Sequence, residues 1–302
     1  MRIGVSLLDP SGPSPMTALR EELQRAADQG FHSAWMNNIF GVDALTALAV
    51  AGSQVPGIEV GTAVVPTYPR HPAVLAQQAR TVAAAVDGRL VLGIGPSHKI
   101  VIEDMFGYDY GKPILHMKEY LAILLPLLDG QPAAFSGTTV RASIGLTTPS
   151  PGRVPVLIAA LGTQMLRLAG TQADGTVLWM TGPATVRDHI VPTITAAAQD
   201  AGRPAPRVVC ILPVCVTDDP DGARERAARI FAIYGELPSY RAMLDREGAV
   251  GPADVAIVGG EDTVAAQIGA LAGTGVTDFV ALEYTRGAEG ARTRAFLRTL
   301  LT

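Results

Sequence analysis

Three side chains that can do chemistry follow one another at Ser97, His98 and Lys99, after the apolar run 90–92 and a Gly-Ile-Gly turn. They offer a hydroxyl, an imidazole and an ammonium group, and an imidazole transfers protons near neutral pH. The unbroken apolar run is typical of a parallel strand that is buried on both faces. Because ligands bind at the carboxyl ends of such strands, segment 88–99 indicates a ligand-binding loop. The plain alternative is a solvated histidine in an ordinary turn.

A second candidate site is the tetrapeptide Ala160, Leu161, Gly162 and Thr163, where a predicted strand gives way to a predicted helix at a glycine. The free N–H groups of a helix start and the helix dipole favour a bound phosphate. An ordinary strand-to-helix turn would have the same sequence.

Asn38 follows the predicted strand 33–36 and offers an amide to a ligand, or it caps the helix that begins near Asp43. Trp35 and Trp179 are expected in the core rather than as stacking platforms. Arg70, His71 and Lys99 are either cations for an anionic ligand or solvated surface charges.

Composition excludes several classes of function. The 302 residues are 48% hydrophobic and 17% charged, with a net charge of −4 and a pI near 5.7, which argues against a nucleic-acid partner. The five histidines form no HExxH motif, and the two cysteines, Cys210 and Cys215, have a spacing that suits neither a disulfide nor a shared metal. No segment has the length of a membrane span, so we expect a cytoplasmic protein.

Short β-branched runs alternate with amphipathic stretches along the whole chain, as in consecutive βα units. We predict an α/β fold in which one (β/α)8 TIM barrel spans 1–302, with an insertion or lid at 100–153 after the fourth strand. A doubly wound sheet is not favoured, because no GxGxxG motif is present. The predicted strands are 3–7, 33–36, 59–65, one within 88–99, 156–159, 175–179, 208–216 and 278–283. The predicted helices are 17–29, 43–50, 73–86, 116–128, 164–172, 184–201, 221–234, 262–274 and 290–300, with a β-hairpin in AAFSGTTVRA.

In a barrel the residues that follow each strand meet at one mouth. Here they include Leu8 and Asp9, Asn38, Gly95, Ser97 and His98, and Gly162. Amides, hydroxyls and cations outnumber carboxylates in this set. The mouth therefore suits a polar-edged, anionic planar ligand better than hydrolysis by a pair of carboxylates.

Four blocks carry a resemblance to a known family: SAWMNNIFGVDALTALA, EVGTAVVPTYPRHPAVLAQQARTVAA, GRLVLGIGPSH and PVLIAALGTQMLRLAGTQADG. They resemble the luciferase-like monooxygenase superfamily, and within it the branch that uses the deazaflavin coenzyme F-420. That branch includes F-420-dependent glucose-6-phosphate dehydrogenase and methylenetetrahydromethanopterin reductase. The similarity covers nearly the whole chain.

The resemblance implies a flavin-like tricycle across the barrel mouth, against a bulge at Ala63, Val64 and Val65 that has a cis peptide bond between Ala63 and Val64. It also implies contacts from Asn38, Gly95, Ser97 and the adjacent His98, and a phosphate at the turn 160–163. The implied activity is hydride transfer between F-420 and a small organic substrate, with His98 and Asn38 as the candidate catalytic residues. An FMN-dependent monooxygenase and a non-catalytic flavin-binding barrel are the alternatives.

Two departures weigh against the sugar-phosphate substrate of the glucose-6-phosphate enzyme. Relatives often carry Asp-His where this chain has Asn38 and Ile39, and that enzyme has a glutamate where this chain has Ser97. The substrate is therefore expected to be a different small molecule, and the resemblance implies a homodimer.

Overall fold

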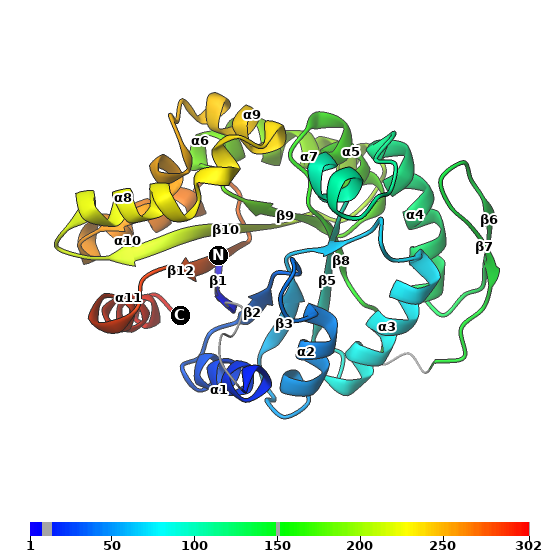
Figure 1. The fold of residues 1–302 in the computed structure, drawn as a ribbon, viewed down its shortest axis with the longest axis horizontal. Coiled ribbons are helices and arrows are strands. Elements are labelled where there is room, and N and C mark those ends of the chain that lie inside the picture. Colours follow the sequence, from blue (N-terminus) through cyan, green and yellow to red (C-terminus); the bar gives the residue numbers. More distant parts are fainter. Residues whose placement is uncertain (8–13, 149–151, 302) are drawn as a thin grey trace.

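A closed barrel of parallel strands forms the centre of the molecule (Figure 1). The computed structural model describes residues 1–7, 14–148 and 152–301. Within them, eight strands pair in the order in which they occur along the chain, and the last pairs with the first, so the predicted TIM barrel is confirmed. The barrel strands are β1 (Arg2–Leu7), β2 (Ser33–Met36), β3 (Glu59–Thr62), β5 (Leu90–Gly95), β8 (Val156–Ile158), β9 (Gly175–Trp179), β10 (Arg207–Val216) and β12 (Asp278–Glu283).

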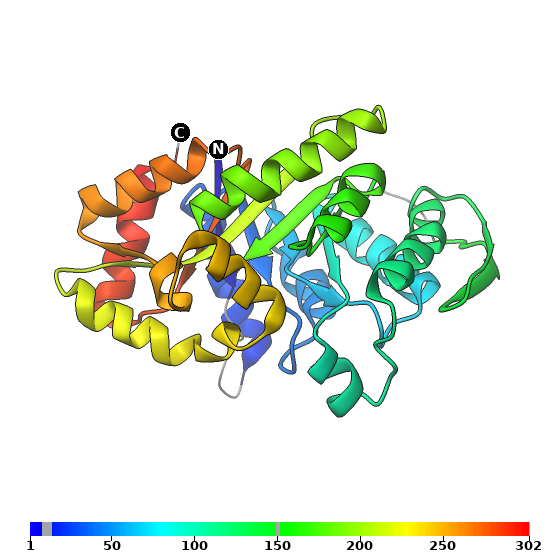
Figure 2. The ribbon, with the colours of Figure 1, turned by 90° about the horizontal axis from the view of Figure 1, so that it is seen from above.

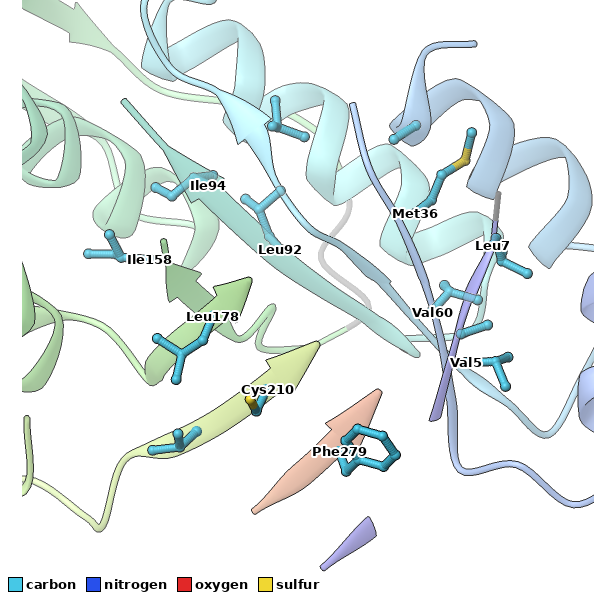
Figure 3. Packing of buried hydrophobic residues seen from close by; sticks show 14 of the residues in the cluster. Val5, Leu7, Met36, Val60, Leu92, Ile94, Ile158, Leu178, Cys210 and Phe279 are labelled. Atoms are coloured by element: carbon cyan, nitrogen blue, oxygen red, sulfur yellow. The ribbon is translucent and has the colours of Figure 1, made fainter. Parts of the chain in front are cut away.

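Helices surround the barrel (Figure 2). They cover the outer face of its strands, whose side chains there are apolar. Val5, Met36, Leu92 and Leu178 point outward from four strands into this core, and all are fully buried (Figure 3). The helices are α1 (Pro15–Asp28), α2 (Ala44–Gly52), α3 (Pro72–Ala85), α4 (Pro113–Leu128), α5 (Thr163–Gln172), α6 (Pro183–Thr185), α7 (Val191–Asp200), α8 (Pro220–Ile230), α9 (Pro238–Glu247), α10 (Glu261–Ala272) and α11 (Gly287–Thr299). Among the described residues, no helix is both long and apolar enough to cross a membrane.

The segment 100–153 contains more than one kind of structure. It begins with a π-helical turn, η1 (Val101–Met105), and contains the predicted hairpin, which consists of β6 (Ala133–Ser136) and β7 (Arg141–Ile144). Between them, α4 packs against α3 and α5, so part of this segment supplies a helix of the surrounding ring.

Some elements differ from the sequence-based expectation. The predicted strand 59–65 is interrupted after Thr62, and β4 (Val65–Pro66) pairs with β5 beyond the interruption. The predicted helix 184–201 contains a π-turn, η2 (Val186–Ile190), which precedes Pro192, a residue with no N–H to donate.

Three elements lie in the long connection after β10 and were not predicted. They are the helix α9, the strand β11 (Ile257–Gly259), which pairs with the end of β10, and the 3₁₀ turn η4 (Pro252–Val255). A second 3₁₀ turn, η3 (Ala232–Gly235), overlaps the end of the predicted helix 221–234.

An ion cluster closes the amino-terminal end of the barrel. Arg207, at the start of β10, forms ion pairs of 2.6 Å with Glu59 of β3 and with Asp278 of β12. Arg2 reaches the same two carboxylates at 3.2 and 3.6 Å. These ion pairs join β1, β3, β10 and β12 at the amino-terminal end of the barrel. Ligands bind at the opposite end of such barrels, where the strands have their carboxyl ends.

Above the ion cluster, apolar side chains fill the barrel interior. Trp35 is fully buried there, as predicted, and its indole Nε1 donates to the Ser33 hydroxyl. Gly61 on the neighbouring strand makes room for this ring, because a Cβ at residue 61 would lie 2.4 Å from Trp35 Cε3. The other members of this layer are Val91, Leu157, Val177, Val209, Ile211 and Val280. The barrel is therefore a packed core below its mouth.

Candidate functional site

The carboxyl ends of the strands form a floor that is partly open to solvent. Side chains alternate along a strand, so the residues two positions beyond the buried interior layer also face inward. Unlike that layer, they are only partly buried. They are Ser6, Asn37, Ala63, Ala159, Trp179 and Leu282, together with Val64. Small side chains occupy most of one half of the floor, and Trp179 and Leu282 occupy the other half.

A backbone bulge raises one edge of this floor. The peptide bond between Ala63 and Val64 is cis, as the resemblance implied. Gly93 allows the bulge, because a Cβ there would lie 2.0 Å from the Thr62 carbonyl oxygen. A Cβ on Gly95 would lie 3.0 Å from Val64 Cγ2 and 3.1 Å from Ala159 Cβ. The two glycines of the Gly-Ile-Gly turn thus allow the neighbouring strands to approach β5 closely, and neither glycine has a positive φ.

Ser97 and His98 lie at the rim, directly after β5. Ser97 has a left-handed backbone with φ of 61°, which is uncommon outside glycine and marks many functional sites. The His98 ring lies 5.4 Å from the ring of Tyr240, which α9 supplies. Burial lowers the pKa of His98 below its ordinary value, so the imidazole is neutral at pH 7. Lys99 pairs with Glu103 at 3.6 Å and is largely exposed.

A chain of contacts holds the Ser97 turn to the neighbouring strand loop. The Tyr110 hydroxyl donates to the Ser97 carbonyl at 3.1 Å, and the Tyr68 hydroxyl donates to the Tyr110 carbonyl. Tyr68 stacks on His116 with ring centres 3.9 Å apart. Thr67 Oγ1 lies 3.0 Å from His116 Nε2 and donates to the Gly95 carbonyl at 3.3 Å. Tyr68, Tyr110, His116 and Thr67 thus connect the Ser97 turn to the loop after β4.

The two asparagines after β2 have different surroundings. Asn38 Oδ1 accepts a 2.9 Å hydrogen bond from the backbone N–H of Ala44, the first residue of α2, so this side chain caps the helix. Asn37 follows Trp35 by two residues and faces inward by alternation. Its Oδ1 is buried without a hydrogen-bond partner in the described chain. Sequence reasoning gave the role to Asn38, although counting the alternation from Trp35 would have selected Asn37.

The turn after β8 presents an open helix start. Gly162 is the N-cap of α5 and has no capping side chain, and the backbone N–H groups of residues 163–165 have no partner in the described chain. His189 Nε2 donates to the Leu161 carbonyl at 2.8 Å and thereby fixes the turn. The side chain of Ala160 is fully buried in the outer core, and so is that of Val65 beside the bulge. At these two predicted positions only the backbone can face a ligand.

An aromatic wall stands over the apolar half of the floor and was not predicted. Trp179 lies edge-on against Phe231 and Tyr234, each with ring centres 5.6 Å apart. Tyr234 in turn contacts Tyr240, which contacts His98. We call Trp179, Phe231, Tyr234 and Tyr240 the aromatic wall. Trp179 was expected in the core; it packs against the core and is only partly buried, at the mouth. Trp179 belongs to β9, and Phe231 and Tyr234 lie within the predicted helix 221–234. The helix α9, which supplies Tyr240, was not predicted.

A carboxylate holds the helix that carries Tyr240. Glu247 at the end of α9 accepts hydrogen bonds from the backbone N–H groups of Ala184 at 3.0 Å and Thr185 at 2.6 Å. These groups belong to the start of α6, just after β9, and the Thr185 hydroxyl also donates to the Met243 carbonyl. The wall is therefore fixed to the barrel before any ligand binds.

Other predicted contributors have partners elsewhere. Arg70 forms an ion pair with Asp43, and His71 caps α3 through its Nδ1 while its Nε2 contacts the Arg141 carbonyl. Leu8 and Asp9 lie outside the described residues. Two surface hollows of the described chain, one bordered by Thr217 and Glu289 and one at the β6–β7 turn, contain no residue of the barrel interior. Among all the residues that the structure describes, no group of three or more His, Cys, Asp or Glu is placed to hold a metal ion.

Comparisons with known proteins find sequence relatives and solved structures with a similar fold. The 5,10-methylenetetrahydromethanopterin reductase of Methanolobus tindarius is 29% identical over 266 residues, which cover 87% of this chain and 80% of that protein. The structure of the coenzyme F-420-dependent tetrahydromethanopterin reductase of Methanopyrus kandleri superposes with a TM-score of 0.84 at 22% identity, covering 98% of this chain and 97% of that one. An F-420-dependent secondary alcohol dehydrogenase, solved with an F-420–acetone adduct, gives a TM-score of 0.83 at 18% identity, with 99% and 97% coverage.

A family model described as luciferase-like monooxygenase matches residues 1–278, which is most of the chain. With the closed barrel and its mouth, this match establishes that the chain belongs to the luciferase-like monooxygenase family.

Proposed function

We propose that this protein is an oxidoreductase that uses coenzyme F-420 to exchange a hydride with a small organic substrate. The observation that carries the proposal is the floor of the mouth, where the small side chains Ala63 and Ala159 and the backbone of Gly95 leave a flat surface beside the open start of α5. The relatives named above support this choice, because they are named for F-420 or for a reaction of the same class.

The residues present fit such a cofactor in two ways. A tricyclic ring has room above the small half of the floor, where the buried Asn37 Oδ1 still needs a hydrogen-bond donor. The N–H groups of residues 163–165 offer donors to a phosphate of the cofactor, and the α5 dipole favours its charge.

The cofactor, when bound, supplies the hydride acceptor or donor, and the protein supplies position and environment. The aromatic wall borders the remaining space and excludes water from it, which favours an apolar substrate surface there. His98 lies at the rim with a lowered pKa, so at neutral pH its imidazole accepts a proton from a substrate hydroxyl. In the reverse direction the same nitrogen returns the proton. Asn38 follows β2 at the same end of the barrel, and because its Oδ1 accepts from the Ala44 N–H, only its amide N–H groups are left to donate to a substrate oxygen.

Cofactor titration tests the proposal. We expect F-420 to bind at micromolar concentration or below, followed as a change in its own fluorescence, and FMN to bind more weakly. Reduced F-420 should then be oxidised in the presence of one member of a panel of enones, imines and ketones. Tight binding of FMN with no affinity for F-420 would support the flavin monooxygenase alternative. Binding of F-420 without turnover of any substrate would support the non-catalytic barrel.

Homodimer formation, a cytoplasmic location and a single domain over 1–302 remain predictions from the sequence.

A further inference from the structure

The geometry points to Asn37 as the residue that recognises the N–H edge of a ligand ring in the barrel mouth. This inference rests on the proposed function and adds a residue to it. Asn37 Oδ1 is one of few buried side-chain polar atoms in the described chain that lack a hydrogen-bond partner. An unpaired buried carbonyl costs free energy, so proteins retain such a group mainly where it has a use.

The position of Asn37 fits a ring lying against the bulge. The β2–β3 pairing places Met36 opposite Thr62, and the Ala63 N–H donates to the Met36 carbonyl at 2.8 Å. Asn37 is therefore level with Ala63, the first residue of the cis peptide bond. Its side chain borders the same half of the floor as Ala63.

The chemistry of the side chain selects one kind of ligand edge. A primary amide combines an acceptor oxygen with N–H donors on one flat group. It complements a ligand that presents an N–H next to a carbonyl, such as the imide edge of a deazaflavin or flavin ring. Within the described residues, Asn37 Oδ1 has no hydrogen bond that would have to break when a ligand binds.

The adjacent asparagine supplies a matched control, because its side chain is used differently. Replacement of Asn37 by Leu removes an unpaired polar group, so it should leave the Tm unchanged or raise it. Replacement of Asn38 by Ala removes the hydrogen bond to the Ala44 N–H and should lower the Tm. Opposite effects on stability from two neighbouring asparagines would not arise if both were structural.

The test measures F-420 affinity by fluorescence and the Tm by calorimetry for the full chain. We expect Asn37→Leu and Asn37→Asp to weaken F-420 binding about tenfold, the latter because a carboxylate has no N–H to donate. A ring analogue methylated at the imide nitrogen should bind the wild type about tenfold more weakly than the unmethylated ring, and Asn37→Leu should lose this discrimination.

Equal affinities in wild type and Asn37→Leu would overturn the inference, and so would a Tm lowered by Asn37→Leu as much as by Asn38→Ala. If discrimination against the methylated ring survives in Asn37→Leu, the residue does not read the imide edge. A wild type that binds neither F-420 nor FMN would instead contradict the proposed function, so the two failures are distinguishable.

Discussion

The hydroxyl of Tyr110 donates a 3.1 Å hydrogen bond to the carbonyl oxygen of Ser97, a residue whose φ is 61°. The donor comes from the segment after η1, and the acceptor comes from the end of β5. This bond stabilises a backbone conformation that serine adopts only at a cost. It therefore contributes to the position of His98, the next residue.

Tyr110→Phe removes this hydrogen bond and keeps the ring that stacks on Tyr68. We expect F-420 affinity to fall about fivefold, in line with about 1 kcal/mol for one hydrogen bond, with a small change in Tm. In a Ser97→Gly background the left-handed turn needs no support, so Tyr110→Phe should have a smaller effect there. Additive effects of the two changes on affinity would show that the hydroxyl does not act through the turn.

Tyr240 sets the environment of His98 from across the mouth. Tyr240→Ala should expose the imidazole to water and raise the pKa of His98 toward its ordinary value of 6.5, because burial causes the lowering. Tyr240→Phe keeps the ring and should leave that pKa nearly unchanged. Titration of the His98 ring protons by NMR measures both. A pKa that is the same in all three proteins would mean that another neighbour buries the ring.

Glu247 fixes α9 through two backbone N–H groups, on Ala184 and Thr185. Glu247→Ala leaves these donors unpaired, so the free energy of unfolding should fall by about 1–3 kcal/mol. Hydrogen exchange should accelerate over α9 in the variant and stay slow over β1 and β2. Glu247→Gln keeps one acceptor oxygen and should lose less stability. Unchanged exchange over α9 in Glu247→Ala would show that other contacts hold this helix.

His116 makes stability depend on mildly acidic pH. Burial lowers its pKa from 6.5 to about 4, although nearby Glu119 acts in the opposite direction. As the pH falls below 6.5, the unfolded chain takes up a proton that the folded chain does not. The free energy of unfolding should therefore fall between pH 6.5 and 4, by about 3 kcal/mol from this group. His98, whose pKa is also lowered, acts in the same direction.

Urea unfolding at several pH values checks this, with His116→Gln as the variant that should flatten the slope. The titration of Glu119 does not overlap with that of His116. Its burial would raise its pKa, but hydrogen bonds from Thr138 and Thr139 outweigh that effect and lower the pKa to about 2. The stability it contributes is present above pH 4.5 and is lost between pH 4.5 and 2, below the range of His116. An unchanged slope in His116→Gln would contradict the assignment.

Gly93→Ala places a methyl group against the bulge. Because the nearest atom is a backbone oxygen at 2.0 Å, the strand must shift, and we expect a loss of about 3 kcal/mol or more. Gly269→Ala is a matched change in the exposed middle of α10 with nothing within 4 Å, and should stabilise by about 0.5–1 kcal/mol. Chemical denaturation compares the two variants. Similar stabilities would mean that the bulge can rearrange.

The barrel could be predicted from the sequence because each strand is a short apolar run bounded by turn residues. The hairpin followed from the same signals, and the cis bond at Ala63–Val64 followed from the family resemblance. The aromatic wall could not be predicted, because Tyr234 and Tyr240 are far from Trp179 in the sequence and belong to a 3₁₀ turn and to the helix α9 in the long connection after β10. The difference between Asn37 and Asn38 depends on which side of β2 each faces. That side becomes certain only when Trp35 is placed inside the barrel.

Arg207 joins carboxylates that are 148 and 71 residues away along the chain, on β3 and β12. Neither half of the protein holds this set of charges by itself. A fragment that ends before Asp278 leaves the arginine short of one carboxylate and leaves β1 without the strand that covers its other edge. Two fragments produced by cutting the chain between the two halves should therefore not fold separately. Recovery of structure on mixing them would show that β1 has paired with β12 and that Arg207 has met Glu59 again.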